Sequence, residues 1–272
     1  MNTGIKQFLS IFIFALVVCS TAFAASPRDL RTLSGKTTIR KDVTAPGVQT
    51  QKIEPVEAAA DWAHWNEKAW VATKIAVNSI WIPQARIQNV RINGPAATCT
   101  FDCLQGPDLS KSIRLFLLPS DVPVKVANIY ADAIAGAFKD WQESVRIPGL
   151  LIFPGFAGYP GPMAPPTPSV PVPLISLQAN KMNELILPDQ LLGRLMEQLR
   201  KTDMSVDTDT RNEMLLFSHM LTMKFYGWLN SARVQVQGHG PVPSFAPPFQ
   251  PVGPVIGGEV IPSSNVIIGN LN

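Results

Sequence analysis

Apolar side chains recur every three or four residues in four separate stretches of the chain, which predicts four amphipathic helices. The first is expected between Pro55 and Pro83, because proline suits a first helical turn and ends a helix that it interrupts. The others are expected over residues 123–144, over 188–201, and from a capping box at residues 210–213 to Trp228. The expected buried stripe of the first helix is Ala58, Trp62, Trp65, Ala69, Ala72, Ala76 and Ile80. The stripe of the fourth is Met214, Phe217, Leu221, Phe225 and Trp228.

Several shorter segments have the composition or alternation that predicts strands. Residues 85–92 are rich in β-branched side chains, and residues 112–118 form an apolar run of strand length closed by Pro119. Residues 231–237 alternate apolar and polar positions, and residues 265–270 form a possible edge strand. We therefore expect an α+β fold in which amphipathic helices pack with short strands.

One phrase, W-x-x-[QS]-[AV]-R-[IV], occurs three times, each time after a helical run and before a Gly/Pro turn. Its tryptophans and arginines are Trp81 and Arg86, Trp141 and Arg146, and Trp228 and Arg233. The unequal spacing indicates one supersecondary unit used three times rather than a regular solenoid. The arginines have two interpretations: structural contacts to helix C-terminal carbonyls or aromatic rings, or a ligand contact repeated three times.

Two long tracts, residues 148–173 and 238–258, are rich in proline and glycine. The composition of the first tract excludes an ordinary helix or central strand. The two tracts carry the aromatic residues Phe153, Phe156, Tyr159, Phe245 and Phe249. Because disordered linkers are depleted of aromatics, we expect ordered, extended segments packed on a surface of this chain or a neighbour. The alternative is that residues 164–171 are a polyproline ligand for an aromatic groove.

The N-terminal residues 1–24 have the features of a secretory signal peptide: Lys6, an apolar run over residues 8–18, and a small-x-small site ending at Ala24. An uncleaved membrane anchor is the alternative, but the run is shorter than the roughly 20 residues that span a bilayer. A lipid anchor at Cys19 is a further, minor alternative. Residues 25–54 then predict an extended polar arm and residues 55–272 a single globular region. We expect a periplasmic or extracellular protein with no integral membrane span once the signal is removed.

The net charge and the cysteines limit which partners and bonds the sequence predicts. The 23 basic and 20 acidic side chains give a net charge of +3, with no basic stripe, so nucleic acid is not expected as a partner. Cys99 and Cys103 are close enough in sequence to form a small disulfide in an oxidising compartment. An unpaired or metal-linked state is the alternative, although the chain has only three histidines.

The chain contains no familiar catalytic or nucleotide-binding motif, so we expect no enzyme, cofactor or metal site. A triad assembled by the fold around His64, His219 or His239 is the remaining enzymatic possibility. Trp62 and Trp65, one turn apart, are either core residues or a ligand-stacking pair.

Export, the absence of catalytic motifs and the aromatic-bearing tracts together predict a structural or assembly component. Its setting would be an extracytoplasmic protein complex of the envelope, a secretion system or the surface. Its partners would be other protein subunits, identical or different. The alternative is a soluble binding module that recognises a peptide or envelope polymer through Trp62, Trp65 and nearby aromatics.

Overall fold

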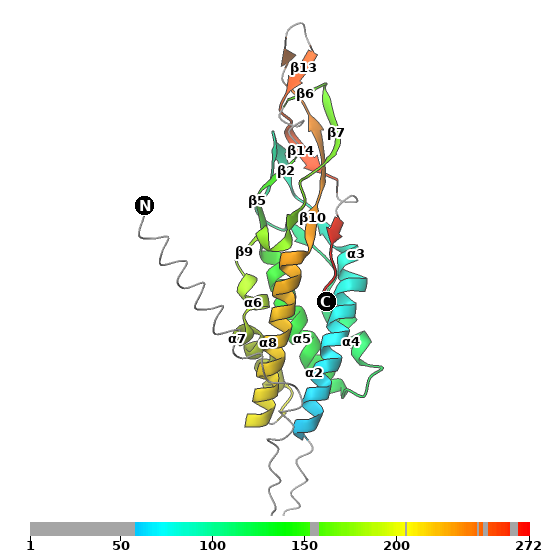
Figure 1. Cartoon of the computed structure of the whole chain (residues 1–272), viewed down its shortest axis with the longest axis vertical. Helices are drawn as coiled ribbons and strands as arrows, with labels where there is room; N and C mark the ends of the chain where they lie inside the picture. The colour runs from blue at the N-terminus through cyan, green and yellow to red at the C-terminus, as the bar shows by residue number, and fades with distance from the viewer. Residues whose placement is uncertain (1–57, 153–157, 205, 244, 247–249, 262–265) are drawn as a thin grey trace, which may run out of the picture. The chain divides into compact units, whose positions relative to one another are not determined.

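A computed structural model describes residues 58–152, 158–204, 206–243, 245–246, 250–261 and 266–272. The chain divides into two units, Met1–Glu54 and Pro55–Asn272, and all described residues belong to the second. The predicted signal peptide (residues 1–24) and arm (residues 25–54) therefore lie outside the described residues. Within the second unit the helices lie together in one part and the strands in another, which makes the chain an α+β protein, as predicted (Figure 1).

The helical part is built around one long central helix. The helices are α2 (Ala58–Ile75), the π-helix η2 (Ala76–Trp81), α3 (Ile82–Gln84), α4 (Leu109–Leu117), α5 (Val124–Ser144), the 3₁₀ helix η4 (Leu174–Ser176), α6 (Met182–Ile186), α7 (Pro188–Lys201) and α8 (Thr208–Ser231). Helix α5 contacts α2, α4, α6 and α7, while α8 lies between α2 and α7 (Figure 1). Because α5 is surrounded, most of its side chains are buried.

The strands form one large sheet and three small ones. They are β1 (Arg86–Ile87), β2 (Arg91–Asn93), β3 (Ala96–Cys99), β4 (Leu104–Gln105), β5 (Val145–Leu151), β6 (Tyr159–Pro160), β7 (Met163–Pro168), β8 (Val172–Pro173), β9 (Gln178–Ala179), β10 (Arg233–Gln235), β11 (Gln237–Pro241), β12 (Phe245–Ala246), β13 (Gln250–Gly253), β14 (Ile256–Val260) and β15 (Val266–Ile268). The seven-stranded sheet has the order β7-β11-β14-β2-β3-β5-β9, and the smaller sheets are β1-β4, β15-β10-β8 and β12-β13-β6. The pairings are antiparallel.

The predicted helices are present, and the differences at their ends have local causes. Helix α7 begins at Pro188 and ends at Lys201, as expected. In the first helix the π-turn holds one more residue than an α-turn, so Trp81 rather than Ile80 completes the buried stripe. Helix α8 starts earlier than the expected capping box, because the Asp207 side chain accepts a hydrogen bond from the Thr210 N–H at 2.7 Å.

The strand prediction for residues 112–118 is wrong, because residues 112–117 belong to α4 and Leu118 is its C-cap. Asp108 caps the helix by accepting a hydrogen bond from the Ser110 N–H, and Leu109, Ile113 and Leu117 bury one face at four-residue spacing. A short apolar run does not by itself distinguish a strand from a buried helix. The cap at Asp108, which lies before the run, makes this segment a helix.

The Pro/Gly tracts supply strands. Strand β5 contains Pro148 and Gly149, but its pairing with β9 involves only Val145 and Arg146, before the tract, so residues 148–151 pair with β3 and not with β9. The β3–β5 register shifts at this dipeptide, so the proline occupies a bulge. By contrast, β7, with three prolines, and β8, with Pro173, lie at edges of their described sheets. Proline at an edge withholds the N–H groups that another strand would need.

The three tryptophans of the repeated phrase meet in one cluster, the tryptophan hub. The ring centroids of Trp81, Trp141 and Trp228 lie 5.8–6.1 Å apart, and Phe138 contacts all three at 4.9–6.1 Å. All four side chains are buried. Since each tryptophan lies near the end of a different helical run, the hub joins three helix ends at the level where the strands begin.

Each repeat leaves its helix through the same backbone turn. Ala85, Val145 and Ala232 have nearly identical dihedral angles, with φ between −67° and −61° and ψ between 135° and 139°. The next residue is the motif arginine, whose Nη1 donates to the carbonyl three residues earlier: Arg86 to Pro83 at 2.9 Å, Arg146 to Glu143 at 3.0 Å, and Arg233 to Asn230 at 2.7 Å. The arginines therefore satisfy orphan carbonyls at the helix C-termini, which is a structural role.

The hub tryptophans differ in the hydrogen bonding of their indole N–H groups. We therefore predict that replacing them lowers the free energy of unfolding by unequal amounts. Trp81 Nε1 donates to Gln142 Oε1 at 2.7 Å, whereas the buried Trp141 Nε1 has no hydrogen-bond partner among the described residues. Trp81→Phe should lower the free energy of unfolding by about 1 kcal/mol more than Trp141→Phe, because it removes a hydrogen bond, whereas Trp141→Phe removes an N–H that is already unpaired. Urea denaturation followed by circular dichroism measures both, and equal costs would contradict the prediction.

Candidate functional site

The sequence-predicted interaction aromatics that the structure describes lie in different elements. Trp62 is 3% exposed and packs edge-on against Trp65 at 4.9 Å, with Tyr130 at 6.5 Å, so it is a core residue and the ligand-stacking hypothesis is wrong for it. Trp65 is half-buried against it, and Tyr159 is half-buried in β6. Phe245 lies in β12, while Phe153, Phe156 and Phe249 lie outside the described residues.

The histidines are dispersed as well. His64 in α2 forms a hydrogen-bonded pair with Asp121 at 2.9 Å, His219 lies in α8, and His239 lies in β11. Across the described ranges, no group of three or more His, Cys, Asp or Glu side chains is placed to hold a metal ion. In the same ranges, no helix has the length and apolar character needed to cross a bilayer.

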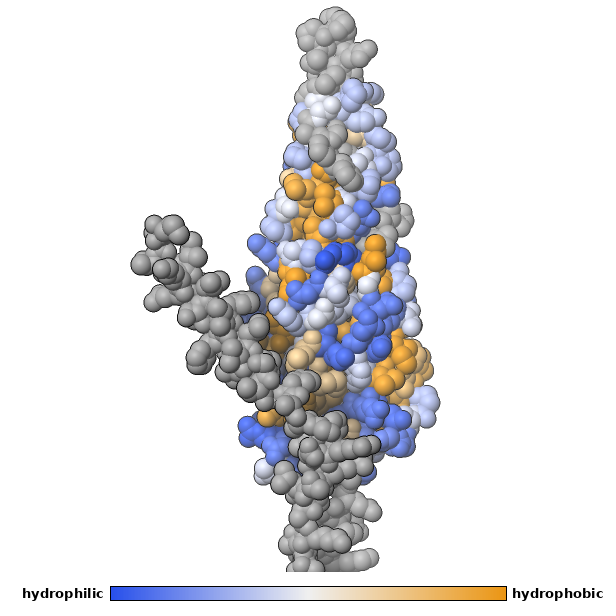
Figure 2. Space-filling view, viewed as in Figure 1, coloured by the Kyte–Doolittle hydropathy of each residue, from blue (hydrophilic) through white to orange (hydrophobic). Residues whose placement is uncertain are grey.

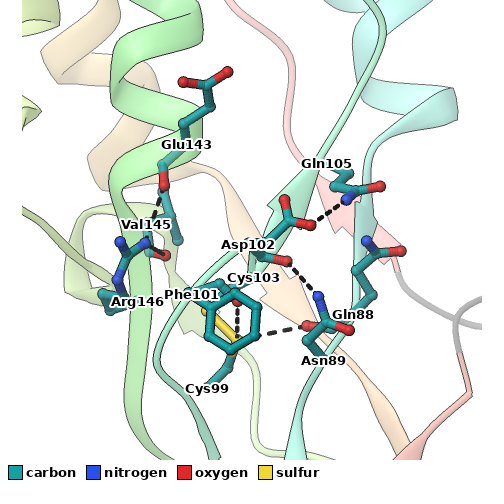
Figure 3. The surroundings of a disulfide bond; sticks show 10 residues. All are labelled: Gln88, Asn89, Cys99, Phe101, Asp102, Cys103, Gln105, Glu143, Val145 and Arg146. Carbon is teal, nitrogen blue, oxygen red and sulfur yellow. Dashed lines mark hydrogen bonds between the residues drawn. A yellow bond between two sulfur atoms is a disulfide. The ribbon is translucent and has the colours of Figure 1, made fainter.

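A groove beside the disulfide is the clearest concave site. Cys99 and Cys103 are bonded, as expected, and close a short loop that presents Phe101 to solvent with 67% of its surface exposed (Figure 3). The groove has a volume of about 560 Å³, within the range of small-ligand sites. Its lining combines the turn before β2, the rung of side chains across β14, β2 and β3, and the disulfide loop.

Two residues with left-handed backbone hold the walls of this groove. Asn89 has φ +57° and Asp102 has φ +50°, a region that asparagine and aspartate enter more readily than other non-glycine residues. They are linked directly, because Asn89 Nδ2 donates to the Asp102 carbonyl at 3.2 Å, and Gln105 Nε2 donates to the Asp102 carboxylate at 2.6 Å (Figure 3). Sequence reasoning identified the cysteines but missed Phe101 and Asn89. The sequence signal that could have identified Phe101 is an aromatic side chain between two paired cysteines.

The outer face of α8 is a second candidate surface. The predicted buried stripe is buried, yet Leu216, Met223 and Tyr226 on the opposite side are more than half exposed. Lys224 is the one residue with a fixed charge between Met214 and Ser231. A helix that is apolar on all sides is normally covered. On the face drawn in Figure 2, apolar patches alternate with hydrophilic ones, so the exposed apolar surface is local rather than continuous.

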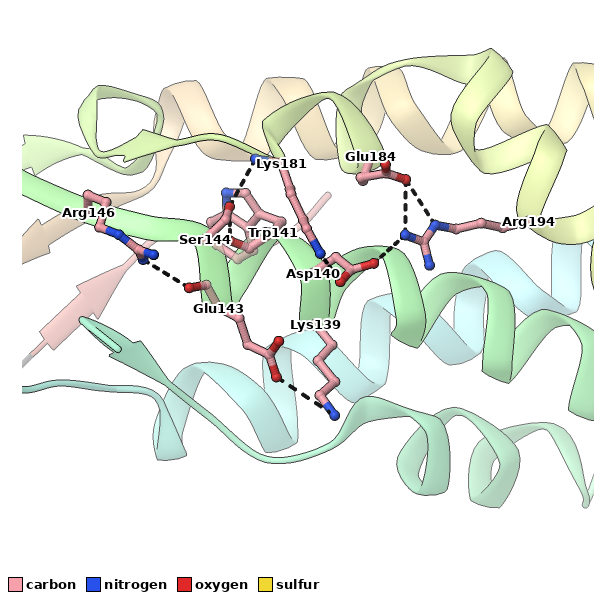
Figure 4. Close-up of polar contacts among 9 residues, drawn as sticks. All are labelled: Lys139, Asp140, Trp141, Glu143, Ser144, Arg146, Lys181, Glu184 and Arg194. Carbon is pink, nitrogen blue, oxygen red and sulfur yellow. Dashed lines mark hydrogen bonds and ion pairs between the residues drawn. The ribbon is translucent and has the colours of Figure 1, made fainter. Parts of the chain in front are cut away.

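An ion network joins α5, α6 and α7. The Asp140 carboxylate accepts from Lys181 Nζ at 2.7 Å and from Arg194 Nη2, while the Arg194 guanidinium also binds Glu184 at 3.0–3.1 Å (Figure 4). Burial raises the pKa of the Asp140 carboxyl, but the hydrogen bonds from Lys181 and Arg194 outweigh it, so the pKa lies below the ordinary 3.8. The network compensates its own charges and leaves no group suited to chemistry, so we assign it to stability.

The ion network predicts a dependence of stability on pH. Because the pKa of Asp140 is lowered by folding, its carboxylate stabilises the fold above the ordinary pKa, and this contribution is lost as the pH falls through the lowered value. Asp140→Asn should therefore lower the free energy of unfolding at pH 7 and make its decline below about pH 4 less steep. Urea titrations across pH test this, with Asp121→Asn as an exposed control expected to have a smaller effect. An unchanged pH profile in Asp140→Asn would contradict the assignment.

The disulfide predicts a modest stabilisation. Only three residues separate the cysteines, so the chain entropy lost on closing the loop is small. Replacing both with serine should lower the free energy of unfolding by about 2 kcal/mol, a loss that oxidised and reduced wild-type protein should reproduce in urea denaturation. A loss twice as large would mean that the loop holds more of the fold than its local contacts indicate.

Comparison with known proteins adds no functional assignment to this geometry. The chain matches no protein-family model, and no curated protein or solved structure matches it either. What the protein does must be inferred from its own contacts and surfaces.

Proposed function

We propose that this chain is an exported, non-enzymatic structural component of an extracytoplasmic protein complex, and that the outer face of α8 is its subunit contact. The observation that carries the proposal is the exposed apolar side of a helix that is already buried on its other side. Export is the expectation from residues 1–24. The tryptophan hub supports the proposal, because it anchors α8 in a rigid frame.

Strand addition is a poorer route to assembly than helix packing. The edge strands β7 and β8 contain prolines, which cannot donate to an incoming strand, and the other edge strands of the described sheets are only two or three residues long. This supports a view in which the proline-rich tract protects sheet edges, in place of the expectation that the tract itself makes the subunit contacts. The assembly surface is then helical.

The spacing on α8 favours a helix as the partner. Leu216, Met220, Met223 and Gly227 follow one another at intervals of four, three and four residues, the spacing of a helix-packing seam. A second copy packed antiparallel would place Leu216 opposite Gly227, so that a large side chain meets the one position without a side chain. Self-association is therefore the form of assembly that we propose.

The expected affinity is modest. Two copies would cover six side chains that are now more than half exposed, Leu216, Met223 and Tyr226 of each copy. At roughly 1–1.5 kcal/mol each, the gain is about 6–9 kcal/mol. That lies within the estimated association cost of about 4–15 kcal/mol. Assembly through this face alone should consequently depend on concentration.

The proposal predicts that charges on the outer face of α8 abolish association. Leu216→Glu with Met223→Glu should give a folded monomer, whereas wild-type chain should increase in mass with concentration in light scattering after size exclusion. Leu115→Glu with Leu118→Glu, which charges two exposed residues at the end of α4, is the matched control and should behave as wild type. A wild-type chain that stays monomeric at all concentrations, or a control that also dissociates, would contradict self-association through α8.

A further inference from the structure

The groove beside the disulfide has a floor built from three strands. Arg91 in β2 lies opposite Thr98 in β3 and Glu259 in β14, so these three side chains form one rung across the sheet. Gln88 and Asn89 border one side of the groove, and Phe101 lies in the disulfide loop that also lines it. The site therefore combines one exposed aromatic ring with amide, hydroxyl and charged groups.

The walls of the groove are held before any ligand arrives. The disulfide closes the Phe101 loop, the Gln88 N–H donates to the Cys103 carbonyl at 3.1 Å, and Asn89 binds the Asp102 carbonyl. The Asn89 side chain still has its carbonyl oxygen and one N–H proton to offer. Such restraint lowers the entropy cost of binding.

The composition of the groove selects among ligand classes. Arg91 is accompanied by Glu259, with Nη1 and Oε1 3.5 Å apart, so the floor has no excess charge for an anion or a nucleic acid. Strands β14, β2 and β3 are each paired on both sides, so no free strand edge is present to bind the main chain of a peptide. The groups left to bind a ligand are the aromatic ring of Phe101, which can cover an apolar surface, and neutral side chains that both donate and accept hydrogen bonds.

We propose that this groove binds a segment of uncharged glycan that carries acetamido groups. The C–H face of a pyranose ring covers the Phe101 ring, and the side chains of Gln88 and Thr98 bind hydroxyl groups. The Asn89 side chain, with its remaining carbonyl oxygen and N–H proton, matches the N–H donor and carbonyl acceptor of an acetamido group. A pyranose presents an apolar face and a polar rim, which is the combination that the groove offers. The proposal concerns a ligand of the strand part and goes beyond the subunit contact proposed for α8.

Isothermal titration of the purified chain with the tetramer of N-acetylglucosamine tests the proposal. Saturable binding is expected, with affinity at least tenfold lower in Phe101→Ala. Because Phe101 is largely exposed, this variant should keep the wild-type fold and stability. Leu115→Ala, an exposed apolar residue outside the groove, should bind like wild type.

A second variant tests whether binding requires the disulfide that holds the wall of the groove. Replacing Cys99 and Cys103 with serine frees the loop that carries Phe101 and should weaken binding while the helical content is kept. The glucose tetramer, which lacks acetamido groups, should bind at least tenfold more weakly than the acetylated tetramer. Equal binding of the two tetramers overturns the acetamido assignment. No binding of either tetramer, binding unchanged in Phe101→Ala, or preferential binding of a sulfated glycan or a peptide overturns the proposal.

Discussion

The contact among Trp81, Trp141 and Trp228 is the constraint on which the rest of the structure depends. Each tryptophan lies near the end of one helical run, and the chain turns into a strand within five residues. When the three rings pack together with Phe138, they align the three exits at one level, so the β1-β4 sheet, the β15-β10-β8 sheet and the large sheet start from a common base. The motif arginines complete each exit by binding carbonyls that the ending helix leaves unpaired.

The hub also explains how a chain rich in proline and glycine keeps ordered strands. Short strands with few ladder hydrogen bonds are weak alone. Here β1, β5 and β10 begin directly at helix ends that the hub holds, which limits the conformations open to the strands that follow. The C-terminus is tied to the same region, because Asn78 in the π-helix exchanges two hydrogen bonds with the Leu271 backbone and Trp228 Nε1 donates to the Gly269 carbonyl.

Helix positions and the α+β class could be predicted because they follow local rules. The 3.6-residue periodicity, Pro188 at a first turn and the buried stripe of α8 are readable within one segment. Residues 112–118 were misassigned because a short apolar run fits both periods, and the deciding cap at Asp108 lies outside the run. The bulge that holds Pro148 in β5 could not be predicted, because it depends on the register with β3.

The groove and the α8 surface lay beyond prediction for a different reason. Phe101 lines a groove together with Arg91, Thr98 and Glu259, and sheet pairing brings these three together from distant parts of the chain. The sequence alone determined the four long helices, the disulfide and the threefold phrase, since these depend on neighbours along the chain. Only the tertiary structure decided that the three tryptophans meet, that Trp62 is buried and that one side of α8 is left exposed, because burial is set by contacts between segments far apart in sequence.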